Sequence, residues 1–100
     1  MARLITPDGV GNRDLFPLDM GVFEVEEIYA AIGCQWGYAE WHRVDADTVL
    51  VMDEDGKRKK LDPNPFATSL MVRKLPQGDM VRGTVLVCSA VEAGYNDVDD

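Results

Sequence analysis

The residues of this chain that are best suited to covalent chemistry are one histidine, His42, and two cysteines, Cys34 and Cys88. A cysteine acts as a nucleophile when a base such as histidine lies within hydrogen-bond reach. Nothing in the sequence places Cys34 beside His42. Cys88 falls in the apolar run VLVCSA, where a free cysteine packs like a small hydrophobe. We therefore expect reduced structural thiols and a chain that is not an enzyme.

The carboxylates around Gly56 invite a test for calcium binding, since DEDG resembles part of a calcium loop. If Gly56 filled the glycine position of such a loop, Val51 would take the first ligand position and Asp62 the last. Valine has no oxygen ligand to offer. We expect neither a metal nor a cofactor.

A basic run, Lys57-Arg58-Lys59-Lys60, is the strongest feature for anion recognition. Ammonium and guanidinium groups bind phosphate, so this run could share a nucleotide with residues elsewhere in the chain. The basic residues that could gather with it around a phosphate are Arg43, Arg73, Lys74 and Arg82. A run of charge on an edge strand is more often a solvated face.

Three aromatic residues, Trp36, Tyr38 and Trp41, fall in one short stretch. Tryptophan and tyrosine dominate the energetics of protein contacts, so an exposed pair would mark a binding patch. In a regular strand Trp36 and Tyr38 point to one side and Trp41 to the other. One face can then fill the core while the other forms an interface, and both readings stay open.

Length and composition indicate one domain of 100 residues with 46% hydrophobic content. No apolar run is long enough to span a bilayer and no secretion signal opens the chain, so we expect a cytoplasmic protein without membrane contact. The net charge of -8 argues against non-specific nucleic-acid binding. Acidic residues crowd the end, which predicts a domain over 1–91 and a flexible tail over 92–100. Because so small a core gives limited stability, a homo-oligomer is possible.

Apolar periodicity and turn residues predict the elements that position these groups. A first strand covers ARLIT, the segment 9–14 forms a loop, and a helix runs from about 21 to 33 with Asp19 as cap and Gly33 as stop. Asp55-Gly56 predicts a hairpin turn, and Asn64 the cap of a second helix. The remaining predictions are strands at 36–44, 48–52, 57–61 (the return strand of the hairpin) and 81–90, and the second helix near 65–73. The fold class is α+β, with an antiparallel or mixed sheet of about four to five strands.

The order of these motifs resembles a family of small domains of unknown function encoded by bacteriophages and mobile elements. The likeness runs from about Glu24 to Val87 through an aromatic strand with Glu40, the turn DEDGK, the motif LDPNPFAT and the closing segment GDMVRGTVLV. The positions that match the family pattern are Gly56, Asn64, Ala67, Thr68 and Gly83. The resemblance implies a compact α+β domain that acts by binding a host protein or a signalling nucleotide.

These observations together predict a non-enzymatic accessory protein that binds and modulates a host macromolecule. The surfaces expected to carry this binding are the Trp36–Trp41 region and the basic Lys57–Lys60 run. The alternative is a small-ligand module that binds or sequesters a nucleotide through Asn64, Thr68, Arg43 and Arg82.

Overall fold

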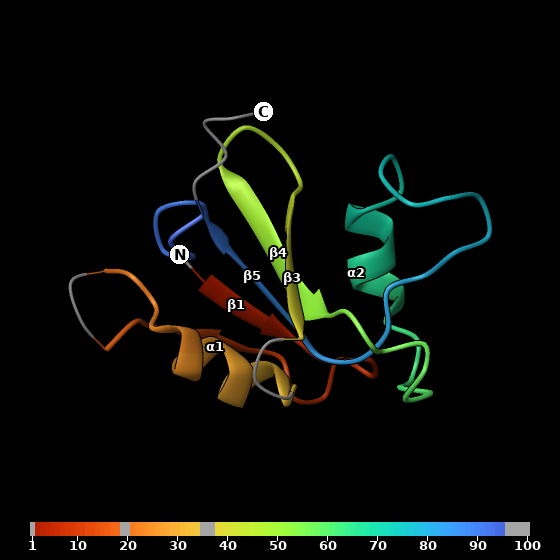
Figure 1. Ribbon diagram of the computed structural model, residues 1–100, viewed down its shortest axis with the longest axis horizontal. Helices are drawn as coiled ribbons and strands as arrows, with labels where there is room; N and C mark the ends of the chain where they lie inside the picture. Colours follow the sequence, from red (N-terminus) through yellow and green to blue (C-terminus); the bar gives the residue numbers. More distant parts are fainter. Residues whose placement is uncertain (1, 19–20, 35–37, 96–100) are drawn as a thin grey trace.

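The computed structural model describes residues 2–18, 21–34 and 38–95 of the chain. These residues form five strands and two helices in the order β1 (Ala2–Ile5), β2 (Arg13–Leu15), α1 (Val25–Ile32), β3 (Ala39–Arg43), β4 (Thr48–Asp53), α2 (Pro65–Leu70) and β5 (Val85–Ser89). The predicted α+β class is confirmed (Figure 1). Neither described helix is long and apolar enough to cross a membrane.

All five strands join one antiparallel sheet in the order β2-β1-β5-β4-β3. Strand β5 is the last in the chain, yet it lies between β1 and β4. The N-terminal hairpin β1–β2 and the central hairpin β3–β4 are therefore joined only through β5. Strand β5, residues 85–89, therefore completes the sheet.

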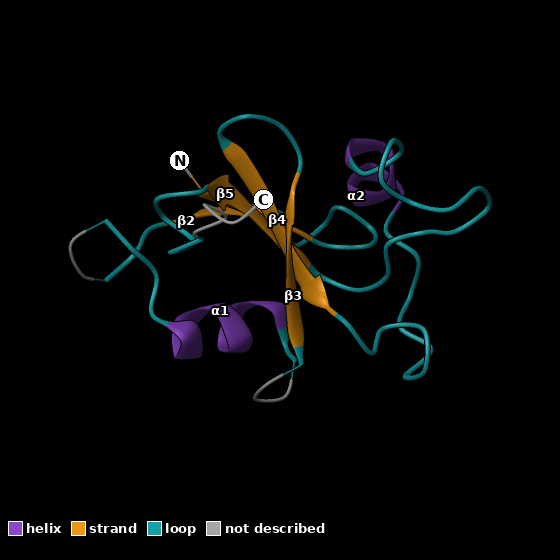
Figure 2. Cartoon of the chain, turned by 45° about the horizontal axis from the view of Figure 1, so that its top comes forward, coloured by secondary structure: helices purple, strands orange, loops and turns teal. Residues whose placement is uncertain are grey.

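The two helices cover opposite faces of the sheet (Figure 2). Successive side chains of a strand point to opposite faces, so each strand contributes to both layers. On one face α1 packs Ile28 and Ile32 against a core that includes Val51 and Leu86. On the other face α2 places Ala67 and Met71 against a second group, which includes Ile5, Leu50 and Val85. We call these the α1-side core and the α2-side core.

Helix α1 begins at Val25, later than the predicted start near residue 21. Phe23 N donates a hydrogen bond to Glu92 O at 2.7 Å, which holds the chain extended just before the helix. Glu27 Oε1 then accepts from Glu24 N at 2.8 Å, as in the reach-back half of a capping box. Asp19, the predicted cap, lies outside the described residues. The stop at Gly33 is confirmed, with φ of 74° in the left-handed region.

Helix α2 starts where the sequence predicts. Asn64 Oδ1 accepts a hydrogen bond from Ala67 N at 3.1 Å. Pro65 is the first residue of the helix, and its lack of an N–H costs nothing because an N–H at this position would have no intrahelical acceptor. The helix ends at Leu70, earlier than the predicted 73, and Met71 N bonds back to the carbonyls of Ala67 and Thr68.

The Asn64 side chain also joins α2 to the sheet. Its amide Nδ2 donates to Ile5 O at 3.1 Å and to Gly83 O at 2.9 Å, and the residue is fully buried. Both amide protons and the amide oxygen are thus used inside the protein. The end of β1, the start of α2 and the segment before β5 meet at this one side chain.

The predicted return strand over Lys57–Leu61 is wrong. Both edges of β4 are already occupied, by β3 and β5, so no position beside it is left for a strand from this segment. The chain forms a series of turns instead, in which Lys59 N donates to Asp55 O at 2.9 Å and Leu61 N to Gly56 O at 2.9 Å. The hairpin of the sheet is the one that links β3 to β4.

Three other boundaries differ from the sequence expectations. The predicted loop 9–14 overlaps β2, and the last strand begins at Val85 rather than 81, because Gly83 adopts φ of 84° just before it. At the C-terminal side a turn continues to Tyr95, with Ala93 buried and its N donating to Ser89 O at 3.0 Å. The predicted boundary after residue 91 falls inside this turn. Residues 96–100 of the predicted tail lie outside the described residues.

We expect Asn64→Ala to lower the free energy of unfolding by about 3 kcal/mol. The change removes a helix cap worth about 1 kcal/mol and leaves two buried carbonyls without their donors, at about 1 kcal/mol or more each. Urea denaturation followed by circular dichroism measures the loss.

Ser69→Ala is the matched control, since Ser69 lies exposed on the same helix and bonds only to Phe66 O. Its effect should stay within about 0.5 kcal/mol. Asn64→Asp keeps the capping oxygen but turns a carboxylate oxygen toward the carbonyl oxygens of Ile5 and Gly83, so at neutral pH it should be at least as destabilising as Asn64→Ala. Equal stability of Asn64→Ala and Ser69→Ala would contradict the joining role of Asn64.

Candidate functional site

The aromatic stretch is divided between core and surface. Trp41 is half-buried and packs against the α1-side core, opposite the fully buried Val51 in the β3–β4 register. Tyr38 is 42% exposed, and Trp36 lies outside the described residues. Trp41 therefore serves the core as well as the edge of the sheet, and the described part of the stretch forms no broad aromatic patch.

The basic run is partly neutralised by its own loop. Arg58 pairs with Asp55 at 2.8 Å, and Lys59 Nζ lies 2.7 Å from Asp53 Oδ2. The Asp53 side chain is only 2% exposed and also accepts a hydrogen bond from Asp55 N. Lys57 and Lys60 are the two exposed lysines of the run, with no ion pair among the described residues. The two paired side chains of the run, Arg58 and Lys59, therefore stabilise the turn in which they lie.

The four residues expected to hold a nucleotide do not converge. Asn64 is buried, and the Thr68 hydroxyl donates to Asn64 O at 2.8 Å and accepts from Val81 N at 2.9 Å. Arg43 is the last residue of β3, opposite Val49 near the start of β4, with its guanidinium carbon 5.4 Å from the centre of the Tyr95 ring.

Arg82 lies beyond the other end of β4, where it contacts Gly56 and donates to Leu61 O at 3.0 Å. Positions 49 and 53 of a strand are roughly 13 Å apart. The two guanidinium groups also contact different partners, Tyr95 and Leu61 O, so in this structure they do not form one phosphate site.

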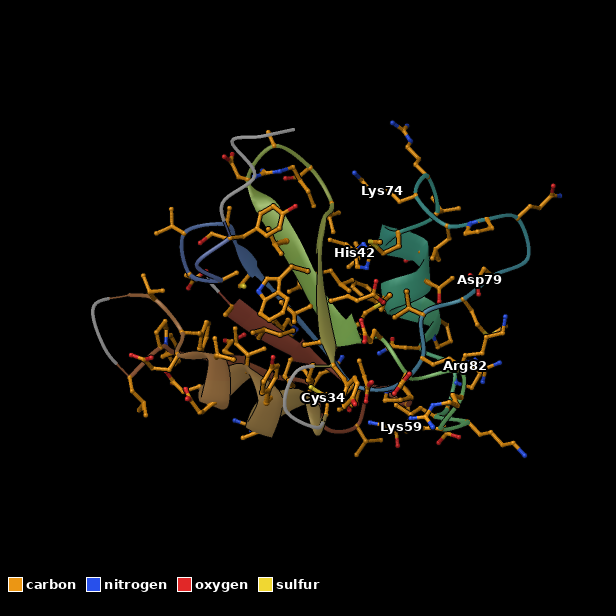
Figure 3. All side chains as sticks on the ribbon, viewed as in Figure 1. Cys34, His42, Lys59, Lys74, Asp79 and Arg82 are labelled. Carbon is orange, nitrogen blue, oxygen red and sulfur yellow. The ribbon has the colours of Figure 1, made fainter. Side chains whose placement is uncertain are left out.

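A pocket of about 180 Å³ lies between the end of β4 and the segment 75–82. Its charged lining consists of two cations and four carboxylates: Lys57, Arg82, Glu40, Asp53, Glu54 and Asp79. Figure 3 shows Asp79 and Arg82 on the chain that leads from α2 to β5. The excess of carboxylates opposes a phosphate at this position.

Cys34 and His42 lie on opposite faces of the sheet (Figure 3). Cys34 packs against the α1-side core, whereas His42 is paired with Leu50, a member of the α2-side core. Burial, with the negative charge of Asp53, raises the pKa of the Cys34 thiol. Burial, helped by the carboxylate of Glu92, raises the pKa of Cys88 to about 12. A thiol and imidazole so separated cannot form a catalytic pair.

A groove that the sequence did not predict lies between β2 and α1. It has a volume of about 350 Å³, and we call it the β2–α1 groove; it is lined by Arg13, Leu15, Phe16, Leu18, Phe23, Glu27, Ala30 and Ala31. Two of its side chains are large and open to solvent, Phe16 at 72% and Leu18 at 87% exposed.

Glu27 shapes the groove by accepting a hydrogen bond from Leu18 N at 3.2 Å with its second carboxylate oxygen. Exposed Glu24 and Glu26 flank Glu27 at the start of α1. The only sequence signal was the apolar trio Leu15, Phe16 and Leu18 around Pro17, which fits neither a helical nor a strand period.

Comparison with known proteins places the chain in a family. It belongs to the family described as Domain of unknown function (DUF3846), which matches residues 11–100. That match is longer than the stretch from Glu24 to Val87 on which the resemblance was based. No curated protein and no solved structure matches the chain.

We expect Lys59→Met to lower the melting temperature by several degrees, because it leaves the buried Asp53 carboxylate without its cation. Lys57→Met, an exposed lysine of the same loop, should leave the melting temperature nearly unchanged. Differential scanning calorimetry on the two variants makes the comparison. An equal melting temperature for both would contradict the bracing role of Lys59.

The same ion pair predicts a pH dependence. The hydrogen bond to Asp53 raises the pKa of Lys59 above its ordinary 10.5. The stabilisation that accompanies a raised lysine pKa is fully present below the pKa of the unfolded state. It is lost as the pH rises through the pKa of the folded state. The difference in melting temperature between wild type and Lys59→Met should therefore be full at neutral pH and shrink as the pH rises through the raised pKa of Lys59.

The two thiols predict slow alkylation. Near neutral pH, Cys34 in the folded chain should react with iodoacetamide more slowly than cysteine in an unstructured peptide, because its thiolate fraction is lowered. Cys88 should react only after unfolding. His42→Ala should leave the Cys34 rate unchanged, as measured by mass spectrometry. A Cys34 rate above that of the peptide, or one that falls in His42→Ala, would reveal a thiol–imidazole pair.

Proposed function

From the geometry of its surface, we propose that the chain is a non-enzymatic accessory protein that binds and modulates a host protein through the β2–α1 groove. The observation that carries the proposal is the exposure of Phe16 and Leu18 beside that groove. Large apolar side chains left in water favour a partner that covers them, at about 25 cal/mol for each Å² buried.

The charges around the groove specify the chemistry of the partner. The start of α1 gathers three carboxylates, from Glu24 at the N-cap and from Glu26 and Glu27 in the first turn, whereas the groove lining on the β2 side supplies one cation, Arg13. A segment that presents leucine or phenylalanine anchors flanked by lysine or arginine would match both the apolar floor and this charge. Charge complementarity of this kind speeds association and selects among partners.

This proposal moves the binding surface away from the two regions that the sequence suggested. Trp41 packs against the α1-side core, and Arg58 and Lys59 are paired within their own loop. A Trp41→Ala variant would therefore report on packing as much as on binding. Phe16 and Leu18 are better probes, since their side chains are mostly in solvent.

A small-ligand module that sequesters a nucleotide remains the second candidate. What favours it is the pair of cations, Lys57 and Arg82, that line the pocket at the end of β4. The four carboxylates of the same pocket weigh against it.

Selection from a displayed library of short random peptides tests the groove. We expect the full chain to enrich peptides that carry apolar anchors beside basic residues. Phe16→Asp and Leu18→Asp should each weaken binding of a selected synthetic peptide by at least about tenfold in isothermal titration calorimetry. Glu26→Lys should also weaken binding of the peptide. Its loss of affinity relative to wild type should grow as the salt concentration is lowered, because the electrostatic part of binding is then least screened.

Phe66→Asp is the matched control, because Phe66 is 59% exposed but lies on α2, on the opposite face of the sheet. It should leave peptide affinity unchanged. Enrichment of acidic peptides, or equal loss in Phe66→Asp, would contradict the groove. A rise in melting temperature with nucleotides, abolished by Arg82→Ala, would favour the second candidate instead.

A further inference from the structure

Strand β3 forms a regular edge of the sheet whose protection is limited to the charged side chains of Glu40 and Arg43. It runs five residues, Ala39–Arg43, in unbroken register with β4, and it contains neither proline, lysine nor bulge. The other edge, β2, is protected by its length of only three residues. Proteins commonly blunt edge strands with short length, lysine, proline or bulges, because a regular edge is a template for another strand.

The hydrogen-bond pattern shows which backbone groups face outward. Val44 N donates to Thr48 O, and Glu54 N donates to Tyr38 O, so the two ends of the β3–β4 ladder are hydrogen-bonded pairs. Such pairs alternate along an antiparallel ladder. Glu40 and His42 therefore direct their backbone groups to β4, and Ala39 and Trp41 direct theirs away from it. No strand of the described residues pairs with that outer edge.

We propose that β3 pairs with β3 of a second copy of this chain, antiparallel and centred on Trp41. In this register Trp41 lies opposite Trp41 of the partner copy, and Ala39 lies opposite Arg43. The outward N–H and C=O groups of Trp41 then form a hydrogen-bonded pair across the two-fold axis. The two sheets join into one continuous sheet.

The side chains select this register over its neighbours. Glu40 Oε2 and His42 Nε2 lie 3.5 Å apart on one face of β3. Centring on Trp41 places each Glu40 opposite a His42 of the partner, in a non-hydrogen-bonded pair where side chains approach most closely. A shift by two residues one way places Glu40 opposite Glu40, and the other way places His42 opposite His42. Both shifts replace a carboxylate–imidazole pair by like groups.

The Trp41 rings support the same register on the opposite face. Each ring is half-buried against its own α1-side core, so its outer edge can meet its counterpart across the axis. Aromatic pairs opposite each other in a sheet stabilise it beyond their buried area. The β2–α1 groove lies at the other end of the sheet, so pairing at β3 leaves it accessible.

Sedimentation velocity of the full chain over a range of concentrations tests the proposal. We expect a concentration-dependent dimer, since a five-stranded sheet that gains one short ladder buries a small interface. Ala39→Pro removes an outward N–H and leaves the bonds to β4 intact, so it should abolish the dimer without unfolding the chain. Circular dichroism and the melting temperature verify the fold of this variant.

Two charge variants test the register itself. Glu40→Lys places a lysine opposite His42, and His42→Glu places two carboxylates opposite each other, so each variant alone should dimerise at least about tenfold more weakly than wild type. An equimolar mixture of the two should recover a heterodimer, since a lysine then lies opposite the new glutamate and His42 again lies opposite Glu40. Native mass spectrometry distinguishes the heterodimer from the two homodimers by mass.

Three results would overturn the proposal. Wild type might remain monomeric at millimolar concentration, a dimer might persist in folded Ala39→Pro, or the mixture might fail to recover dimer while the two variants are folded. A dimer that persists in Ala39→Pro but is lost in Phe16→Asp would place the contact at the β2–α1 groove instead.

Discussion

The buried side chain of Asn64 is the interaction on which the arrangement of the chain depends. A single amide group meets the end of β1, the first turn of α2 and the segment that leads into β5. These segments are distant in sequence, and β5 can enter between β1 and β4 only if the chain beyond α2 is turned toward that slot. In a buried environment each of these hydrogen bonds is costly to leave unmade. Asn64 thereby couples a local event, the start of a helix, to closure of the sheet.

Local patterns predicted the elements well. The α+β class, the cap at Asn64, the stop at Gly33 and the core position of Cys88 all follow from caps, positive φ and apolar runs, which act within a few residues. Strand order could not be predicted in this way, because the pairing of β5 with β1 joins residues at opposite ends of the chain. The error at Lys57–Leu61 has the same origin. An Asp-Gly turn predicts a hairpin, but β3 and β5 already occupy the two positions beside β4.

The candidate site was harder to predict than the fold. Four consecutive bases look like an anion-binding feature, and only the folded turn shows that Asp53 and Asp55 neutralise two of them. The aromatic stretch was consistent with either a surface patch or the core, and only the position of α1 on the same face shows that Trp41 packs against the α1-side core. The β2–α1 groove arises from two segments that each look unremarkable in sequence. The lining residues lie together because Glu27 accepts a hydrogen bond from Leu18 N, which holds the loop beside the helix.

The distribution of charge separates the two proposed surfaces. A net charge of -8 opposes self-association, since identical copies repel one another. That repulsion is smallest where local charge is balanced, and β3 carries Glu40 beside Arg43, with His42 between them. The first turn of α1 carries three carboxylates instead, so two copies would repel at the groove while a basic partner would be attracted. At physiological salt such effects act over about 8 Å, which is shorter than the width of a five-stranded sheet at roughly 4.8 Å per strand. In the two proposed contacts each edge of the sheet would therefore select its partner by its own local charge, and both contacts could be made at once.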